Sequence, residues 1–257
     1  SMSLRRTWPV VITIIFVILL AIALGTLYYW IVPKAPTIEQ ATIVEVVLKG
    51  TLDEFPPSNP WAEFLTADSL SLWELRQVFK AAAQDNRVLG IYLEIHLLAL
   101  SWAQAEELRD LIQEFRRSGK QIHAFLAVDM IREIELYLAS ATHSITVNPD
   151  AGLLVNGLIS EVTFFKGIMD NLHIKPQFIQ FKEFKSPEVF TRRAMSPDFR
   201  EMSESILSDI EQRFVFSVAQ DRQIDEQILH DVMEIGVAPV TKALESGLVD
   251  TLGYRDD

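Results

Sequence analysis

The sequence predicts an α/β domain with parallel strands, extended by a helical C-terminal part and preceded by one long apolar segment. Three observations lead to this prediction. β-rich and helical segments alternate from Ala41 to Pro149, and their short connections imply parallel strands joined by crossover helices. Beyond Pro149 helical periodicity dominates. Val10 to Val32 is a run of residues without a charge.

The composition limits the kinds of protein that this chain can be. Its 257 residues are 49% hydrophobic, enough for one sizeable core, and we expect a single folded domain. The chain has no cysteine, which excludes disulfides, thiolate chemistry and cysteine-based metal sites. The formal net charge of −12 argues against non-specific binding to nucleic acid, which requires a basic face. Nucleic acid is therefore not an expected partner.

The apolar run near the N-terminus is long enough to cross a bilayer as a helix. Arg5 and Arg6 precede it, and aromatic residues flank it, as expected for an anchor whose N-terminus is cytoplasmic. The alternative is a cleaved signal peptide, because Ala21 and Ala23 have the small-x-small spacing of a cleavage site. The predicted division is a cytoplasmic N-terminus at 1–7, a transmembrane anchor at 8–32, a linker at 33–40 and the folded domain at 41–257.

The folded domain is predicted to begin with repeated β and α units. Ser71 and Glu74 form a capping-box pattern at the start of the first helix, and Gly119 is suited to the left-handed position after the second. Strands are expected at 41–48, 87–95, 121–127 and 144–149, and helices at 71–85, 101–119 and 130–141.

The C-terminal third is predicted to be mainly helical. A helix is expected at 161–172, a strand at 176–181 and a long helix at 197–222. An apolar residue recurs every four positions in the long helix, which indicates one buried stripe. The stripe consists of Met202, Ile206, Ile210, Phe214 and Val218.

Most sequence motifs of enzyme chemistry are missing. The five histidines form no HExxH or comparable ligand pair, so no metal site is predicted, and each histidine is expected to be hydrogen-bonded or exposed. Neither nucleotide-binding glycine motifs nor a GxSxG elbow is present. The acidic pairs Glu133/Glu135 and Glu106/Glu107 do not share a helix direction, and we expect them on solvated faces.

One stretch, "FKEFKSPEVFTRRAMS" at 181–196, can carry chemistry. Lys182 and Lys185 lie three residues apart among phenylalanines. A lysine held against apolar groups has a lowered pKa and can act as a base, whereas a lysine in a solvated loop keeps its charge. Spacing alone does not decide between these two states.

Several segments in order resemble the signal peptide peptidase A family, also called protease IV. They are "SLWELRQVFKAAAQDNRVLGIYLEI", "EFRRSGKQIHAF", "LYLASATHSITVNP" and "FKSPEVFTRRAMSPDFRE", and the resemblance extends from Ala41 to Asp257. Members are membrane-tethered bacterial serine peptidases with a ClpP/crotonase-like fold of repeated ββα/βα units. In them a lysine, rather than a histidine, activates the serine.

The resemblance implies a role for each residue of Phe184-Lys185-Ser186, which matches the family's lysine motif. Lys185 is the expected general base, Ser186 is a possible orienting group or a turn residue, and Lys182 is expected to stay exposed and dispensable. The resemblance also implies cleaved signal peptides as substrates, no cofactor, a homotetramer, and a place in the bacterial inner membrane with the main domain outside the cytoplasm.

The chain departs from the family pattern at the nucleophile. Alignment on Tyr137 puts Ile134 where the serine is expected and Glu135-Leu136 where a glycine pair is expected. Leu97 to Leu100 replaces the glycine-rich turn after the second strand, although an oxyanion hole usually needs glycines there. Ser140 and Ser144 are the nearby hydroxyls. Ser140 falls in a helical run whose amides are already paired.

A lysine without a serine resembles the N-terminal half of the long two-domain members. The serine would then come from a following domain or a partner subunit, and the 257-residue chain alone is expected to be inactive. Two alternatives remain open: an inactive pseudo-peptidase that acts as an assembly or scaffold subunit, and a crotonase-like acyl-thioester enzyme. The last generally needs the glycine-rich amides that this sequence lacks.

Overall fold

The computed structural model describes residues 4–31, 38–56, 70–179 and 187–256, which fall into two compact units. The first unit, Ser1–Glu39, contains one helix, α1 (Leu4–Ile31), whose described side chains between 13 and 28 are all exposed. Within the residues that the structure describes, no helix combines the length and apolar character of a membrane span. The second unit, Gln40–Asp257, contains all the other elements.

The second unit is built on a five-stranded parallel sheet, as the alternation of β and α segments predicts. Its order is β1-β2-β3-β5-β8, and every neighbouring pair is parallel. Parallel neighbours require crossover connections, and helices supply most of them. The strands are β1 (Thr42–Gly50), β2 (Val88–Leu98), β3 (Gln121–Leu126), β5 (Ser144–Val147) and β8 (Thr251–Leu252).

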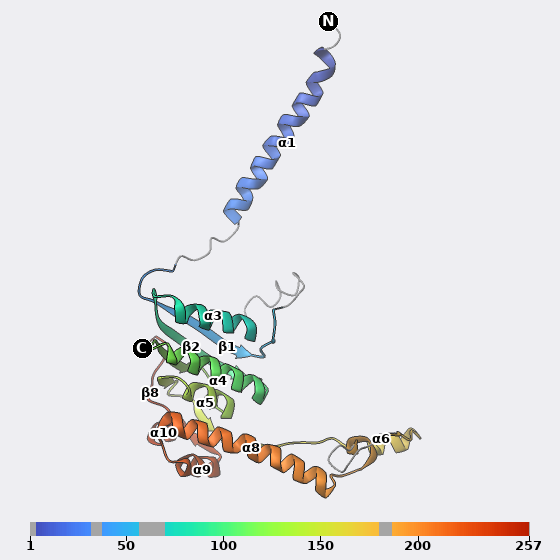
Figure 1. Cartoon of the computed structure of the whole chain (residues 1–257), viewed down its shortest axis with the longest axis vertical. Coiled ribbons are helices and arrows are strands. Elements are labelled where there is room, and N and C mark those ends of the chain that lie inside the picture. The colour runs from blue at the N-terminus through green and yellow to red at the C-terminus, as the bar shows by residue number, and fades with distance from the viewer. Residues whose placement is uncertain (1–3, 32–37, 57–69, 180–186, 257) are drawn as a thin grey trace. The chain divides into compact units, whose positions relative to one another are not determined.

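Three helices cover one face of this sheet and lie side by side (Figure 1). They are α3 (Leu72–Gln84), α4 (Trp102–Arg117) and α5 (Glu133–Ser140). The predicted capping box at Ser71 and Glu74 is present, and Ser101 with Gln104 forms a second one at the start of α4. Gly119 has a φ of +83°, the left-handed conformation predicted for it. These caps fix where the helices begin and end against the sheet.

The core lies between the sheet and these helices. Alternate strand residues point to it, such as Val46, Leu93 and Ala124, which are almost fully buried. Gly90 on β2 has a packing reason, because a Cβ there would lie 2.4 Å from the carbonyl oxygen of Gln121 on β3. The close approach of these two strands therefore depends on a glycine at position 90.

A second, three-stranded sheet was not predicted from the sequence. It joins β4 (Met130–Ile131), β6 (Gly152–Leu154) and β7 (Val237–Pro239) in the order β4-β6-β7. Strands of two or three residues are too short to give an alternating pattern, which explains the omission. The predicted helix at 130–141 is consequently shorter, since its first two residues form β4.

The C-terminal part is helical, as predicted, but several predicted details are wrong. The helix at 161–172 is reduced to α6 (Lys166–Asn171), and residues 176–179 form no strand; 180 and 181 lie outside the described residues. The remaining elements are α7 (Glu188–Thr191), α8 (Pro197–Arg222), α9 (Glu226–Ile235) and α10 (Val240–Glu245).

The apolar stripe of α8 is buried only in its C-terminal half. Phe214 and Val218 are buried, but Ile206 is 54% exposed. Figure 1 shows the reason, since α8 runs along α5 and then extends past the other helices toward α6. We call the described residues of 158–213 the arm. Within them only Glu188 and Ser196 are buried.

One buried cation joins the helix layer to α8. The guanidinium of Arg109 on α4 donates to the carbonyl oxygen of Tyr137, to Ser140 Oγ at 2.9 Å and to the carbonyl oxygen of Ser217 at 3.1 Å. Its Nη2 atom also lies 2.5 Å from the Asp221 carboxylate. Burial lowers the pKa of Arg109, and the neighbouring Asp221 charge opposes that effect. The side chain thus binds α5 and α8 at the same time.

We predict that Arg109→Ala lowers the free energy of unfolding by about 3–5 kcal/mol, because it leaves the Asp221 carboxylate and two carbonyl groups without their buried partner. Arg76→Ala is the matched control, since Arg76 and its partner Glu107 are both largely exposed. The control should lose less than about 1 kcal/mol. Urea denaturation of the two variants measures both values, and equal losses would contradict the role given to Arg109.

Candidate functional site

The predicted base lies outside the described residues. Lys185, Ser186 and Lys182 belong to residues 180–186. The structure describes the chain up to Ile179 and again from Pro187. The roles of these three residues therefore stay predictions.

A buried carboxylate fixes the chain directly after this segment. Glu188, the first residue of α7, is 4% exposed. Its Oε2 accepts the N–H of Ser196 at 2.9 Å, and its Oε1 accepts the Ser196 hydroxyl at 2.5 Å. The same hydroxyl oxygen accepts the N–H of Phe199 and caps α8. Glu188 therefore closes the loop 188–196 onto the start of α8.

The pKa of Glu188 is the result of opposed effects. Burial raises the pKa, whereas the two hydrogen bonds from Ser196 and the charge of the nearby Arg192 lower it. The lowering effects are together larger, so the pKa of Glu188 is below its ordinary value. Arg193 forms an ion pair with Asp170 of α6 at 2.9 Å, and Arg222 with Asp250 at 2.6 Å. These arginines pair with carboxylates of the chain itself.

Ile134 occupies the position expected for the nucleophile. It is the second residue of α5, is partly buried and packs against the core. An aliphatic side chain has no group that can attack a carbonyl. The structure therefore provides no nucleophile at the N-terminal turn of α5.

The two nearby serines are committed to other contacts. Ser140 is fully buried, and its hydroxyl donates to the Tyr137 carbonyl oxygen at 3.0 Å and accepts from Arg109. Ser144 Oγ lies 2.6 Å from His123 Nδ1 on the neighbouring strand, and Tyr92 stacks beside that ring. Burial lowers the pKa of His123. The Ser144–His123 contact is a cross-strand pair between residues in register within the sheet.

Glu135 contradicts the prediction of a solvated face, because it is fully buried. Its Oε1 accepts the backbone N–H of Leu98, at the end of β2, at 2.8 Å. Arg132 Nη2 lies 3.0 Å from the same oxygen and also donates to the Leu98 carbonyl oxygen at 2.8 Å. The position expected for a glycine and the position expected for the glycine-rich turn thus meet, joined by a carboxylate. Both departures from the family pattern are visible in the sequence, but nothing in the sequence indicates that these two segments are in contact.

Glu133 is partly buried and keeps part of its surface in solvent. Its Oε1 accepts the N–H groups of Asn156 and Gly157 at 2.9 and 3.1 Å. Both acidic residues of the first turn of α5 therefore bind backbone donors from other segments. The second acidic pair is as predicted, since Glu106 and Glu107 are at the surface and face Arg213 and Arg76.

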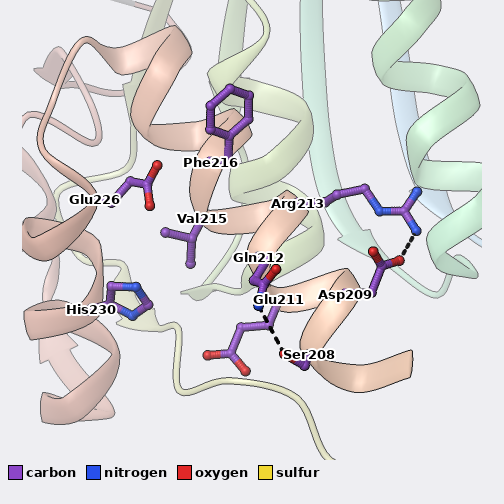
Figure 2. Close-up of a pocket in the computed structure, with 9 residues that line it drawn as sticks. All are labelled: Ser208, Asp209, Glu211, Gln212, Arg213, Val215, Phe216, Glu226 and His230. Atoms are coloured by element: carbon purple, nitrogen blue, oxygen red, sulfur yellow. Dashed lines mark hydrogen bonds and ion pairs between the residues drawn. The ribbon is translucent and has the colours of Figure 1, made fainter. Parts of the chain in front are cut away.

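A surface pocket of about 650 Å³ lies between α8 and α9 (Figure 2). Phe216, Glu226 and His230 are among its lining residues, whereas the side chain of Arg213 extends away from Glu226 and His230 and pairs with Asp209. Among the described residues considered for catalysis, Ile134, Ser140 and Ser144 do not line this pocket. It is separate from the N-terminal turn of α5.

Three of the five histidines have structural partners, and His173 and His230 are exposed. His143 Nδ1 accepts the N–H of Ile122 at 3.1 Å, and burial lowers the pKa of His143. His96 lies 2.7 Å from the carboxylate of Glu94. Among the described residues, no group of three or more histidine, aspartate or glutamate side chains is arranged to hold a metal ion. The absence of a metal site stays a prediction.

Together, the parallel sheet, its crossover helices and the helical C-terminal part define an α/β domain whose candidate site lies where β2 ends against α5. The sequence model of Peptidase family S49 matches residues 114–257. The chain belongs to this family, which confirms the resemblance inferred from the sequence.

Two curated relatives agree with this assignment. "Serine protease SPPA, chloroplastic" of Arabidopsis thaliana is 29% identical over 221 residues, covering 86% of this chain and 32% of that protein. "Protease 4" of Salmonella typhi is 25% identical over 197 residues, covering 73% of this chain and 32% of that protein. The chain thus matches about a third of the length of these relatives.

The matches among solved structures are more distant. One is described as "1510-N membrane protease specific for a stomatin homolog from Pyrococcus horikoshii"; it is 11% identical, with a TM-score of 0.43 over 83% of this chain and 74% of that one. An enoyl-CoA hydratase of Shewanella pealeana is also 11% identical, with a TM-score of 0.43 over 84% and 66%.

We predict that Glu188→Gln destabilises the domain at neutral pH but not in acid. Because the folded-state pKa of Glu188 is lowered, its carboxylate stabilises the fold fully above the ordinary value of 4.5 and loses this effect as the pH falls through the lowered folded value. Thermal unfolding of both proteins from pH 7 to pH 3 measures the difference between them, which should shrink toward zero.

The control for this experiment is Glu204→Gln, also a glutamate of the arm but with a largely exposed side chain. Its difference from the wild type should stay small at every pH. A Glu188→Gln difference that is constant with pH would contradict a stabilising ionised carboxylate.

Proposed function

We propose that this chain is the part of a Ser/Lys peptidase that supplies the general base, while the serine comes from a following domain or a partner subunit. The observation that carries the proposal is Ile134, an aliphatic residue at the nucleophile position of a chain that belongs to a family of serine peptidases. A member with the base motif but without a nucleophile can contribute to peptide cleavage only together with a serine from elsewhere.

Lys185 is the proposed base. A neutral lysine amine can take the proton of a serine hydroxyl when its surroundings lower its pKa. Phe184, Lys185 and Ser186 match the lysine motif of the resembled family, and Ser186 is the proposed orienting group. Lys182 has no counterpart in that motif, and we propose that it is dispensable.

Exposed apolar residues of the arm support the proposal that the chain assembles with a partner. Ile159, Leu172 and Ile179 are 85%, 61% and 91% exposed. Exposed apolar side chains gathered on one segment are typical of surfaces that bind another protein. The residues of the arm flank the segment that contains Lys185 in the sequence. A partner that covers the arm would therefore bind to residues that are neighbours of the base in the chain. We propose a homo-oligomer, a tetramer by resemblance.

The proposed substrates are cleaved signal peptides, degraded at the bacterial inner membrane. The support for a membrane location is the sequence of the first unit, where 23 residues from Val10 to Val32 carry no charge and follow Arg5 and Arg6. We propose that this segment anchors the chain with its N-terminus in the cytoplasm and the α/β domain on the other side.

A second candidate is an inactive subunit that serves assembly alone. The contact of Glu135 with the Leu98 N–H favours it, because that backbone donor is not free to bind a substrate carbonyl. In this case Lys185 would have no part in cleavage. The two candidates differ in what happens when Lys185 is removed.

We predict that Lys185→Ala, in the assembled peptidase with its serine-bearing part, lowers peptide cleavage by about 10³-fold or more, as expected for loss of a catalytic base. Lys182→Ala is the matched control, three residues away, and should keep full activity. The rate of cleavage of a fluorogenic signal-peptide substrate gives both values, and size-exclusion chromatography should show unchanged assembly.

Two results would contradict the proposal that this chain supplies the base and another part supplies the serine. Full activity of Lys185→Ala would favour the assembly subunit. Clear labelling of the isolated 257-residue chain by a serine-directed fluorophosphonate would show that the chain has a nucleophile of its own.

We predict that Leu172→Glu disrupts assembly, because a charge within an apolar interface is costly to bury. The expected result is a shift to smaller species in analytical ultracentrifugation. Leu89→Glu is the control, since Leu89 on β2 is similarly exposed, at 56% against 61% for Leu172, but lies outside the arm. Equal assembly of both variants and the wild type would remove the arm from the interface.

A further inference from the structure

We infer that the end of β2 is a binding site for a peptide backbone or carboxylate group that Glu135 and Arg132 occupy from within the chain. Leu98 has one backbone donor and one backbone acceptor, and this ion pair takes both. The N–H binds Glu135 Oε1 at 2.8 Å, and the carbonyl oxygen accepts from Arg132 Nη2 at 2.8 Å.

The geometry resembles that of a bound peptide. An extended peptide beside a strand offers a carbonyl oxygen to an N–H and an N–H to a carbonyl oxygen. At Leu98 the carboxylate oxygen of Glu135 stands for the first group and the guanidinium N–H of Arg132 for the second. The 3.0 Å contact between Arg132 and Glu135 holds these two substitutes together.

Burial distinguishes this contact from a surface ion pair. Glu135 is fully buried, so its carboxylate has lost its hydration and depends on Leu98 and Arg132 for compensation. The same backbone group is in the stretch Leu97 to Leu100, which replaces the expected glycine-rich turn. We interpret the Leu98 N–H as a donor that would otherwise bind the substrate carbonyl. This interpretation rests on the proposed function, because it depends on the alignment that places Ile134 at the nucleophile position.

The consequence is that this domain is closed to a substrate carbonyl at Leu98 while Glu135 is present. Closure does not depend on the missing serine, since the carboxylate would still hold the N–H if position 134 carried a hydroxyl. Removing the Glu135 side chain should open a small polar cavity with a free backbone donor, beside a guanidinium that keeps only its contact to the Leu98 carbonyl oxygen, and this combination suits a small carboxylate.

The test is rescue of Glu135→Ala by acetate. The melting temperature of this variant should fall by about 6–20 °C, as expected for a broken buried ion pair in a domain of this size. Sodium acetate should restore part of the loss, whereas sodium chloride at equal ionic strength should not. The wild type and Glu135→Gln, whose amide still fills the space, should respond equally to the two salts. An equal response of Glu135→Ala to both salts would overturn the inference.

A second measurement decides the matter where Glu135→Ala does not fold. In the wild type, the Leu98 amide should be protected from hydrogen exchange, and in Glu135→Gln its ¹H–¹⁵N resonance should move more than any other amide of β2. Rapid exchange of Leu98 in the wild type would overturn the inference. An active Lys185→Ala enzyme would instead overturn the proposed function, and would leave acetate rescue unchanged.

Discussion

The arrangement of the helical layer depends on one buried cation, the guanidinium of Arg109. The cost of removing a charge from water must be compensated by partners of fixed geometry. Here the partners come from both α5 and α8. The carbonyl oxygen of Tyr137 and the hydroxyl of Ser140 place α5, while Asp221 and the Ser217 carbonyl place α8. Because α5 is held in this way, its first turn meets the end of β2 in a defined position.

The surplus of acidic residues has an internal use. Glu133, Glu135 and Glu188 each accept backbone N–H groups, and in each case the donors belong to another segment of the chain. Buried backbone donors without a partner are costly, and glycine-rich turns in catalytic domains leave such donors for a substrate. Two of these carboxylates, Glu133 and Glu135, lie in the first turn of α5, so this turn binds backbone donors of two other segments of the chain.

Much of this organisation could be predicted from the sequence, because local patterns determine it. The β-rich runs, the capping box at Ser71 and the glycine at 119 depend on neighbours within a few residues. Glu135 could not be placed in the same way, since its partner Leu98 is 37 residues away. The spacing of α8 correctly indicates an apolar face, but periodicity does not say what covers it, and the exposure of Ile206 shows that the described part of this chain does not.

The closed donor at Leu98 and the exposed arm have the same physical origin in the proposed division of labour. A domain that does not hold the substrate carbonyl gains stability by binding its own backbone groups, and a carboxylate with a guanidinium does so without water. A domain that must meet its serine in another domain or subunit needs apolar surface outside its own core, and the arm has it between residues 158 and 213. In this proposal, the chain's own side chains bind the backbone groups of Leu98 that a complete peptidase domain would leave for its substrate. Its apolar side chains are exposed on the arm, where the proposed partner would bind.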